Sequence, residues 1–266
     1  MRAAPHADPA RGVFETMLVL AGRPVELDAH LDRLGASLAA LFGAATPVAA
    51  RSAAVEEARR IGRGKLRLTV SPAEGTGRLR TEILATALDP DEVFPAAGGG
   101  VRLRSFAVPG GFGAHKWADR SLLERAAAAA RPGELPLLVD ADGTALEAVR
   151  ANIFLAGEGW LATPPGDGRI LPGIARRQAI EIAEAAGVEV RERRLGPDDL
   201  RAGEVFLAGS VRGVEPVRAL DGVGLASPGE VSALVAAGLR RRWLPVPREE
   251  PAAVGAGGPR AGRHAR

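Results

Sequence analysis

The first hundred residues alternate between the hydrophobic periods of strands and helices. An apolar stretch over 12–20, followed by the sequence AGRP, predicts a strand that ends in a hairpin turn. The next stretch carries leucines at helical spacing, namely Leu31, Leu34, Leu38 and Leu41. This stripe predicts an amphipathic helix. Further elements are expected as a helix over 46–63 and strands over 65–70, 78–88 and 101–108.

The second half of the chain mixes the same two periods. After a glycine-rich link, the pattern predicts helices over 115–130, 173–187 and 231–244, two or three strands within 135–165, and strands over 188–195 and 204–217. Hairpin signals outnumber strand–helix–strand signals, so the pattern favours an α+β fold over a doubly wound sheet. We expect a smaller N-terminal domain (1–108), a linker (109–115), a larger C-terminal domain (116–244) and a disordered tail rich in Pro, Gly and Arg (245–266).

Composition excludes several functional classes. The chain has no cysteine, which excludes disulfides and thiolate chemistry, and its four histidines are too scattered to predict a metal site. The net charge is +3, most of it in the tail, and only 4% of residues are aromatic, so nucleic acid is not an expected partner. No apolar run predicts a membrane span or a secretory signal, and we expect a cytoplasmic protein.

Lysine is scarce in this sequence. Of 35 basic residues only Lys65 and Lys116 are lysines, and the rest are arginines. A guanidinium stays protonated and does not form an imine, whereas a lysine amine does. Lysine chemistry therefore has two candidate residues. Lys65 lies in a strand of alternating polarity, where a solvated or substrate-facing charge is expected.

A series of motifs between Gly12 and about Ala219 resembles the class IV aminotransferase family, the fold-type-IV enzymes that use pyridoxal 5′-phosphate (PLP). The motifs are FETMLV, HLDRLGAS, HKWADR, LEAVRANIF, TPP, ILPGIAR and EVFLAGSVRGVEPV, in this order. The family includes branched-chain and D-amino-acid aminotransferases and 4-amino-4-deoxychorismate lyase. The resemblance implies two α/β domains, a PLP cofactor, a small-molecule substrate and a homodimer.

The resemblance assigns cofactor roles to particular residues. Lys116 lies where the family attaches PLP, and a freed lysine amine can act as a general base. Glu147 lies where a carboxylate pairs with the pyridine nitrogen, and Arg33 where a guanidinium binds the phosphate. The implied phosphate site also includes Ile174 and Ala175 at a helix N-terminus and the hydroxyl of Ser210, with Ala175 replacing the usual threonine. Without the resemblance, these would be ordinary helix, strand and surface residues.

Substrate recognition is less specified by the sequence. The candidates for contacting the substrate are Phe14, Arg78, Arg80, Arg150 and Arg212, with Arg67 as a further cation. Surface arginines are common in this chain, so each is also a candidate for an ordinary solvated charge. Phe14 lies where some transaminating relatives carry tyrosine, and this chain has no tyrosine.

The resemblance implies a 4-amino-4-deoxychorismate lyase that releases pyruvate and forms 4-aminobenzoate. The chain has eleven residues before Gly12, fewer than the family usually carries. This start resembles lyase segments fused behind an aminobenzoate-synthase component, so association with such a component is a further expectation; a misassigned start codon is the alternative. The alternative functions are an aminotransferase for branched-chain or D-amino acids, and a catalytically weak PLP-binding protein.

Overall fold

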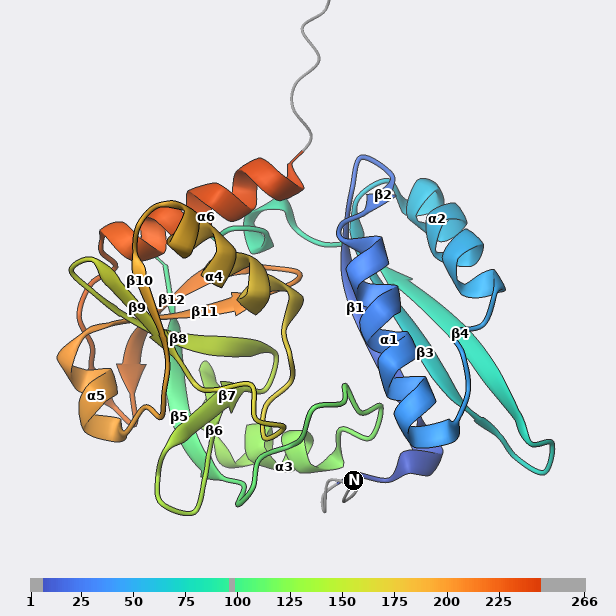
Figure 1. The fold of residues 1–266 in the computed structure, drawn as a ribbon, viewed down its shortest axis with the longest axis horizontal. Coiled ribbons are helices and arrows are strands. Elements are labelled where there is room, and N and C mark those ends of the chain that lie inside the picture. The colour runs from blue at the N-terminus through green and yellow to red at the C-terminus, as the bar shows by residue number, and fades with distance from the viewer. Residues whose placement is uncertain (1–6, 96–98, 245–266) are drawn as a thin grey trace, which may run out of the picture.

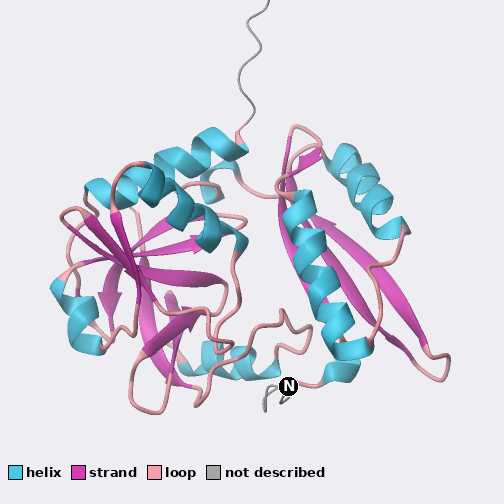
Figure 2. Cartoon of the chain, in the orientation of Figure 1, coloured by secondary structure: helices cyan, strands magenta, loops and turns pink. Residues whose placement is uncertain are grey.

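The computed structural model describes residues 7–95 and 99–244, which form two β-sheets, each carrying its own helices (Figures 1 and 2). The smaller sheet has the spatial order β2-β1-β3-β4. Its strands are β1 (Val13–Leu20), β2 (Arg23–Pro24), β3 (Gly64–Ala73) and β4 (Arg78–Thr86), preceded by the short helix η1 (Pro9–Arg11). Helices α1 (Leu27–Phe42) and α2 (Ala49–Ile61) cover one face of this sheet.

Side chains along β1 point alternately to the two faces of the smaller sheet. Val13, Met17 and Val19 pack in one hydrophobic cluster with the predicted leucine stripe of α1, three of whose members are buried: Leu31, Leu34 and Leu38. The intervening residues Phe14 and Thr16 face the opposite side, because successive side chains of a strand alternate between faces. The structure therefore confirms the predicted strand, hairpin and amphipathic helix.

The larger sheet is mixed, with the main order β10-β9-β8-β11-β12-β5-β6-β7. Its strands are β5 (Val101–Ala107), β6 (Glu134–Val139), β7 (Ala145–Ala148), β8 (Ala151–Gly157), β9 (Trp160–Thr163), β10 (Glu189–Glu192), β11 (Glu204–Gly209), β12 (Gly213–Leu220) and β13 (Val223–Gly224). Helices α4 (Ile174–Ala185) and α6 (Glu230–Trp243) pack against each other, α3 (Ser121–Ala129) contacts β6, and α5 (Pro197–Ala202) contacts β11. Figure 1 shows α4 and α6 together on one side of the sheet and α3 at its lower end.

Three local expectations need correction. The strand β5 pairs in parallel with β12 and β6, so it belongs to the larger sheet, although the predicted boundary at 109 assigned it to the N-terminal domain. The segment 135–165 holds four strands rather than two or three. The helix expected from His115 begins only at Ser121, because Trp117 forms a bridge with Val13 of β1 and its side chain is buried.

The α+β fold class is confirmed by the mixture of helices with parallel and antiparallel strand pairs. The passage from one sheet to the other runs through the short helix η2 (Pro90–Glu92). No described helix is long and apolar enough to cross a membrane. The predicted disordered tail, 245–266, lies outside the described residues.

Candidate active site

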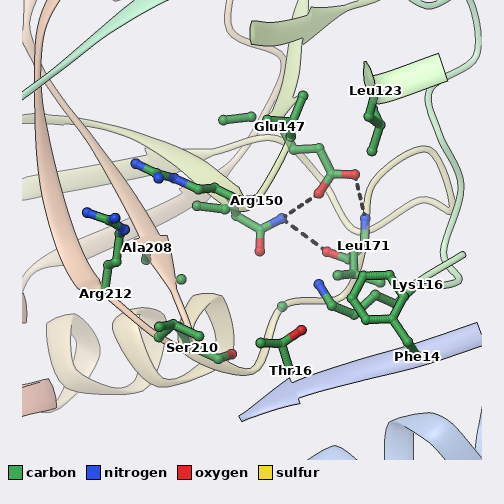
Figure 3. A pocket seen from close by; sticks show the side chains of 18 of the residues that line it. Phe14, Thr16, Lys116, Leu123, Glu147, Arg150, Leu171, Ala208, Ser210 and Arg212 are labelled. Atoms are coloured by element: carbon green, nitrogen blue, oxygen red, sulfur yellow. Dashed lines mark hydrogen bonds between the residues drawn. The ribbon is translucent and has the colours of Figure 1, made fainter. Parts of the chain in front are cut away.

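A cavity of about 330 Å³ lies between the two sheets (Figure 3). The smaller sheet contributes residues of β1 and β3, and Arg33 of α1. The larger sheet contributes β7, β8, the segment around Gly173 that starts α4, and the turn between β11 and β12. Segments that are distant in sequence therefore meet at one site.

Lys116 enters this cavity from an extended segment rather than from a helix. Its backbone carbonyl accepts a hydrogen bond from Phe14 N at 2.8 Å, and Ala118 N donates to Gly12 O at 2.9 Å, so the segment runs alongside β1. Burial and the nearby Arg33 guanidinium lower the pKa of Lys116 to about 8, despite the opposing effect of Glu15. A larger fraction of the amine is therefore uncharged near neutral pH than in an ordinary lysine.

Glu147 is the buried carboxylate of the cavity, 8% exposed on β7. Leu171 N donates to its Oε1 at 3.1 Å and Asn152 Nδ2 to its Oε2 at 3.3 Å (Figure 3). Asn152 stands opposite Glu147 in the hairpin of β7 and β8, which explains the spacing of these two residues in the sequence. Burial raises the pKa of Glu147 to about 7, although Leu171 N and the Lys116 ammonium stabilise its charged form.

Arg33 reaches the cavity from α1 and is fixed by three hydrogen bonds. Its Nε donates to Glu15 Oε1 at 2.8 Å, its Nη2 to Glu15 Oε2 at 2.6 Å, and its Nη1 to Pro172 O at 3.0 Å. A guanidinium carries five N–H donors, so two remain for a further acceptor. Arg33 thus presents free donors beside the segment that leads into α4.

The N-terminus of α4 provides backbone donors at the same end of the cavity. Gly173 occupies the cap position, and no side chain caps the helix. The first N–H groups of a helix have no partner within the helix, and they bind anions. Ala175 and Ser210 line the cavity, whereas Ile174 is buried and only its backbone position belongs to this helix start. A Cβ on Gly173 would lie 1.9 Å from Asn152 Oδ1, so only glycine allows this close approach.

The predicted substrate residues separate into two groups. Phe14, Arg150 and Arg212 line the cavity. Arg78 and Arg80 are exposed on β4 and do not line it.

Both predicted substrate arginines that line the cavity already have carboxylate partners. Arg150 Nη2 lies 2.8 Å from Glu215 Oε1, and Arg212 contacts Glu92 and lies 3.7 Å from the same Glu215 oxygen. Glu215 is buried, and its pKa is raised by that burial although Arg150 opposes the change. We call these four residues the paired wall: Glu92, Arg150, Arg212 and Glu215.

The opposite side of the cavity carries cations around one aromatic ring. The Phe14 ring centroid lies 3.8 Å from Arg67 Cζ, 4.9 Å from Lys116 Nζ and 5.7 Å from Arg120 Cζ. Arg120 Nη2 donates to Val149 O at 2.7 Å. Within residues 7–95 and 99–244, no carboxylate forms an ion pair with any of these cations. We call these four residues the cationic wall: Phe14, Arg67, Lys116 and Arg120.

Sequence reasoning missed the place of Arg120 in the cavity. The residue ends the motif HKWADR, four positions after Lys116, but a helix was expected there and its side chain received no role. Burial, followed by the nearby Arg67, lowers the pKa of Arg120 to about 10. Thr16, which shares the cavity-facing side of β1 with Phe14, also lines the cavity and received no prediction.

Comparisons with known proteins agree with this arrangement. The family model described as amino-transferase class IV matches residues 12–220. A branched-chain-amino-acid aminotransferase of Escherichia coli K12 is 39% identical over 88 residues, which cover 33% of this chain and 28% of that protein. The matched stretch thus spans less than a third of this curated relative.

Solved structures resemble nearly the whole chain. A hypothetical aminotransferase from Mycobacterium tuberculosis in its PLP-bound form superimposes with a TM-score of 0.77 and 25% identity, covering 92% of both chains. The 4-amino-4-deoxychorismate lyase of Pseudomonas aeruginosa superimposes with a TM-score of 0.75 and 25% identity, covering 91% of this chain and 95% of that one. The family match covers more than half of the chain. The chain therefore belongs to the class IV aminotransferase family, whose enzymes depend on PLP.

Proposed function

We propose that this protein is a PLP-dependent 4-amino-4-deoxychorismate lyase. The observation that carries the cofactor assignment is one cavity lined by Lys116, Glu147 and Arg33 together with the uncapped start of α4. These groups suit an aldehyde, a pyridine nitrogen and a phosphate, respectively. Ser210 adds a hydroxyl beside the phosphate position, while Ala175 contributes only its backbone.

The bound cofactor would supply an electron-withdrawing ring that stabilises negative charge on the substrate carbon next to nitrogen. Lys116 would hold the cofactor covalently through Nζ until the substrate amine takes its place. The freed Nζ would then remove the proton from the aminated carbon of the substrate, a role favoured by the burial that lowers the pKa of Lys116 to about 8 in the protein alone. Lys116 thus has two consecutive tasks, as anchor and as base.

Glu147 would hold a proton between its carboxylate and the pyridine nitrogen. Burial raises the pKa of Glu147 to about 7, so its carboxyl group can share a proton with a neighbouring base near neutral pH. The hydrogen bonds from Leu171 N and Asn152 fix the direction of the carboxylate. A proton held on the pyridine nitrogen by this carboxylate would strengthen the ring as an electron acceptor.

The cationic wall supports a substrate with carboxylates. Arg67 and Arg120 present guanidinium groups to the cavity, and the proposed substrate carries two carboxylates. Loss of the proton at the aminated carbon, with cleavage of the bond between the neighbouring ring carbon and the ether oxygen of the enolpyruvyl group, would make the ring aromatic. The leaving enolpyruvate takes up a proton, so the products are 4-aminobenzoate and pyruvate.

The cofactor assignment and the lyase assignment have separate tests. Borohydride treatment of the protein with PLP should attach the cofactor to the peptide that contains Lys116, as measured by mass spectrometry. Protein that binds no PLP after reconstitution would contradict the whole proposal. The lyase assignment predicts pyruvate from 4-amino-4-deoxychorismate without any keto-acid acceptor, and failure of that assay with PLP-loaded protein removes the lyase alone.

An aminotransferase is the second candidate. The 88-residue match to a branched-chain-amino-acid aminotransferase favours it. With such an activity, a branched-chain or D-amino acid would convert the bound cofactor to its amine form and release a keto acid. The absorption spectrum and keto-acid release, measured without added acceptor, distinguish this candidate from the lyase.

We further propose a homodimer, and association with an aminodeoxychorismate-synthase component, from the family resemblance. Light scattering of the purified protein measures the first, and co-purification with the tagged component measures the second. A monomer in solution would contradict the dimer, and separate elution at micromolar concentrations would contradict the association.

A further inference from the structure

The motif FETMLV contains a buried carboxylate that the proposed chemistry does not use. Glu15 lies on β1 and is 1% exposed. Its neighbours on the same face of the strand, Val13 and Met17, belong to the hydrophobic cluster beneath α1. Burying a carboxylate there is costly unless specific partners stabilise the charge. The fold alone gives no reason for an acid at this position.

The partners of Glu15 are His30 and Arg33, both on α1. His30 Nδ1 lies 2.7 Å from Glu15 Oε2, and Arg33 contacts both carboxylate oxygens. Burial acts to raise the pKa of Glu15, but the hydrogen bonds from Arg33 and His30 outweigh it and hold that pKa at about 2. Glu15 is therefore ionised and accepts hydrogen bonds only, so His30 Nδ1 carries the hydrogen.

The contact with Arg33 involves two parallel hydrogen bonds. A two-point contact fixes the plane of a guanidinium as well as its position, whereas a single ammonium has no plane to fix. Pro172 O accepts a further hydrogen bond from Nη1, just before the start of α4. The two N–H donors left on Arg33 are thereby held in fixed directions next to the uncapped helix.

We infer that Glu15 is a positioning residue for the phosphate group of the cofactor, acting through the orientation of Arg33. This inference rests on the proposed binding of PLP. Glu15 itself contacts no phosphate; it keeps the free donors of Arg33 aligned and thus reduces the ordering that binding requires. His30 completes the arrangement by satisfying the second acceptor site of Glu15 Oε2.

The test compares the affinities of the apoprotein for PLP and for pyridoxal, which lacks the phosphate. Both affinities are measured by absorbance or fluorescence titration, and their ratio reports the phosphate site alone. In Glu15→Gln the amide NH₂ faces an arginine N–H, so we expect the ratio to fall roughly 10- to 100-fold while pyridoxal affinity stays within about twofold. Glu57→Gln is the matched control, because Glu57 makes the same two-point contact with Arg60 on the surface of α2.

Glu15→Asp provides a second measurement that keeps both the charge and Arg33. Its side chain is one methylene shorter, so the two-point contact with Arg33 is lost and the ratio should fall as in Glu15→Gln; this variant decides the inference if Glu15→Gln does not fold. Three results for folded Glu15→Gln would each overturn the positioning role. The ratio of affinities could stay unchanged, both affinities could fall equally, or the ratio could rise because Arg33 is no longer neutralised. Wild-type protein that binds PLP no better than pyridoxal would instead overturn the proposed cofactor site.

Discussion

The two walls of the cavity use the same kind of residue for different purposes. On the paired wall, Arg150 and Arg212 meet the buried carboxylate of Glu215, and Arg212 also meets Glu92. On the cationic wall, Arg67 and Arg120 surround Phe14, and no described carboxylate pairs with them. Glu215 and Glu92 thus neutralise Arg150 and Arg212 within the protein, whereas Arg67 and Arg120 have no ion-pair partner among the described residues and are available to an anionic ligand.

The largest expected effect concerns the lysine of the cationic wall. We expect Lys116→Ala to lower kcat by roughly 10³- to 10⁴-fold, because it removes the general base and the covalent attachment point. Lys65→Ala, the only other lysine substitution that the chain offers, should retain activity within about tenfold. Steady-state pyruvate release measures both variants. Equal losses of activity in the two variants would contradict the catalytic role of Lys116.

The charges of the cavity should also appear in the pH dependence of apoprotein stability. Burial raises the pKa of Glu147 from 4.5 to about 7, so its contribution to stability falls as pH rises between these values. Burial lowers the pKa of Lys116 from 10.5 to about 8, so stability recovers as pH rises above 8.

Glu147→Gln isolates the carboxylate part of this effect. In the wild type, ionisation of Glu147 should lower the free energy of unfolding by up to about 3 kcal/mol between pH 5 and 8, and this decrease should be absent in Glu147→Gln. Denaturant unfolding of the apoprotein measures it. A variant whose stability follows the same pH curve as the wild type would show that Glu147 ionises without cost in the folded protein.

The comparison of the two walls becomes sharpest with paired arginine substitutions. Arg67→Met and Arg120→Met should each raise KM for the dicarboxylate substrate by roughly 10- to 100-fold, the loss expected for a charge-assisted contact. Arg150→Met should change KM by less than about threefold, because Arg150 is already paired with Glu215. The reverse order of effects would exchange the roles that we assign to the two walls.

The smallest expected effect is structural. Glu215→Gln leaves Arg150 and Arg212 without their shared partner and should destabilise the protein by about 1–2 kcal/mol. This is less than for a fully buried pair, because the two arginine side chains are 37% and 29% exposed. Thermal unfolding should show a lower Tm, by about 2–4 °C per kcal/mol, with KM unchanged. A changed KM at unchanged Tm would contradict a structural role.

Local patterns in the sequence predicted the smaller sheet well. The leucine stripe of α1 and the AGRP turn depend on neighbours a few residues apart, and the structure has both. The motif spacing also predicted that Lys116 and Glu147 belong together, and the structure places both in one cavity.

The remaining features depend on contacts between distant segments. Residues 115–120 have the composition of a helix start, but pairing with β1 holds Trp117 in an extended segment. The partner of Arg150 is Glu215, which lies 65 residues further along the chain, so the sequence could not separate a paired arginine from a free one. Likewise, β5 belongs to the larger sheet because it pairs with β12 and β6, which lie further along the sequence.

The backbone contact between residues 116–118 and β1 has a mechanical consequence. Hydrogen bonds tie Lys116 to β1 of the smaller sheet, whereas Glu147 is part of the larger sheet. A hinge motion between the sheets would therefore change the separation of the two residues. The alignment of the lysine with the carboxylate thus depends on how the two sheets pack against each other.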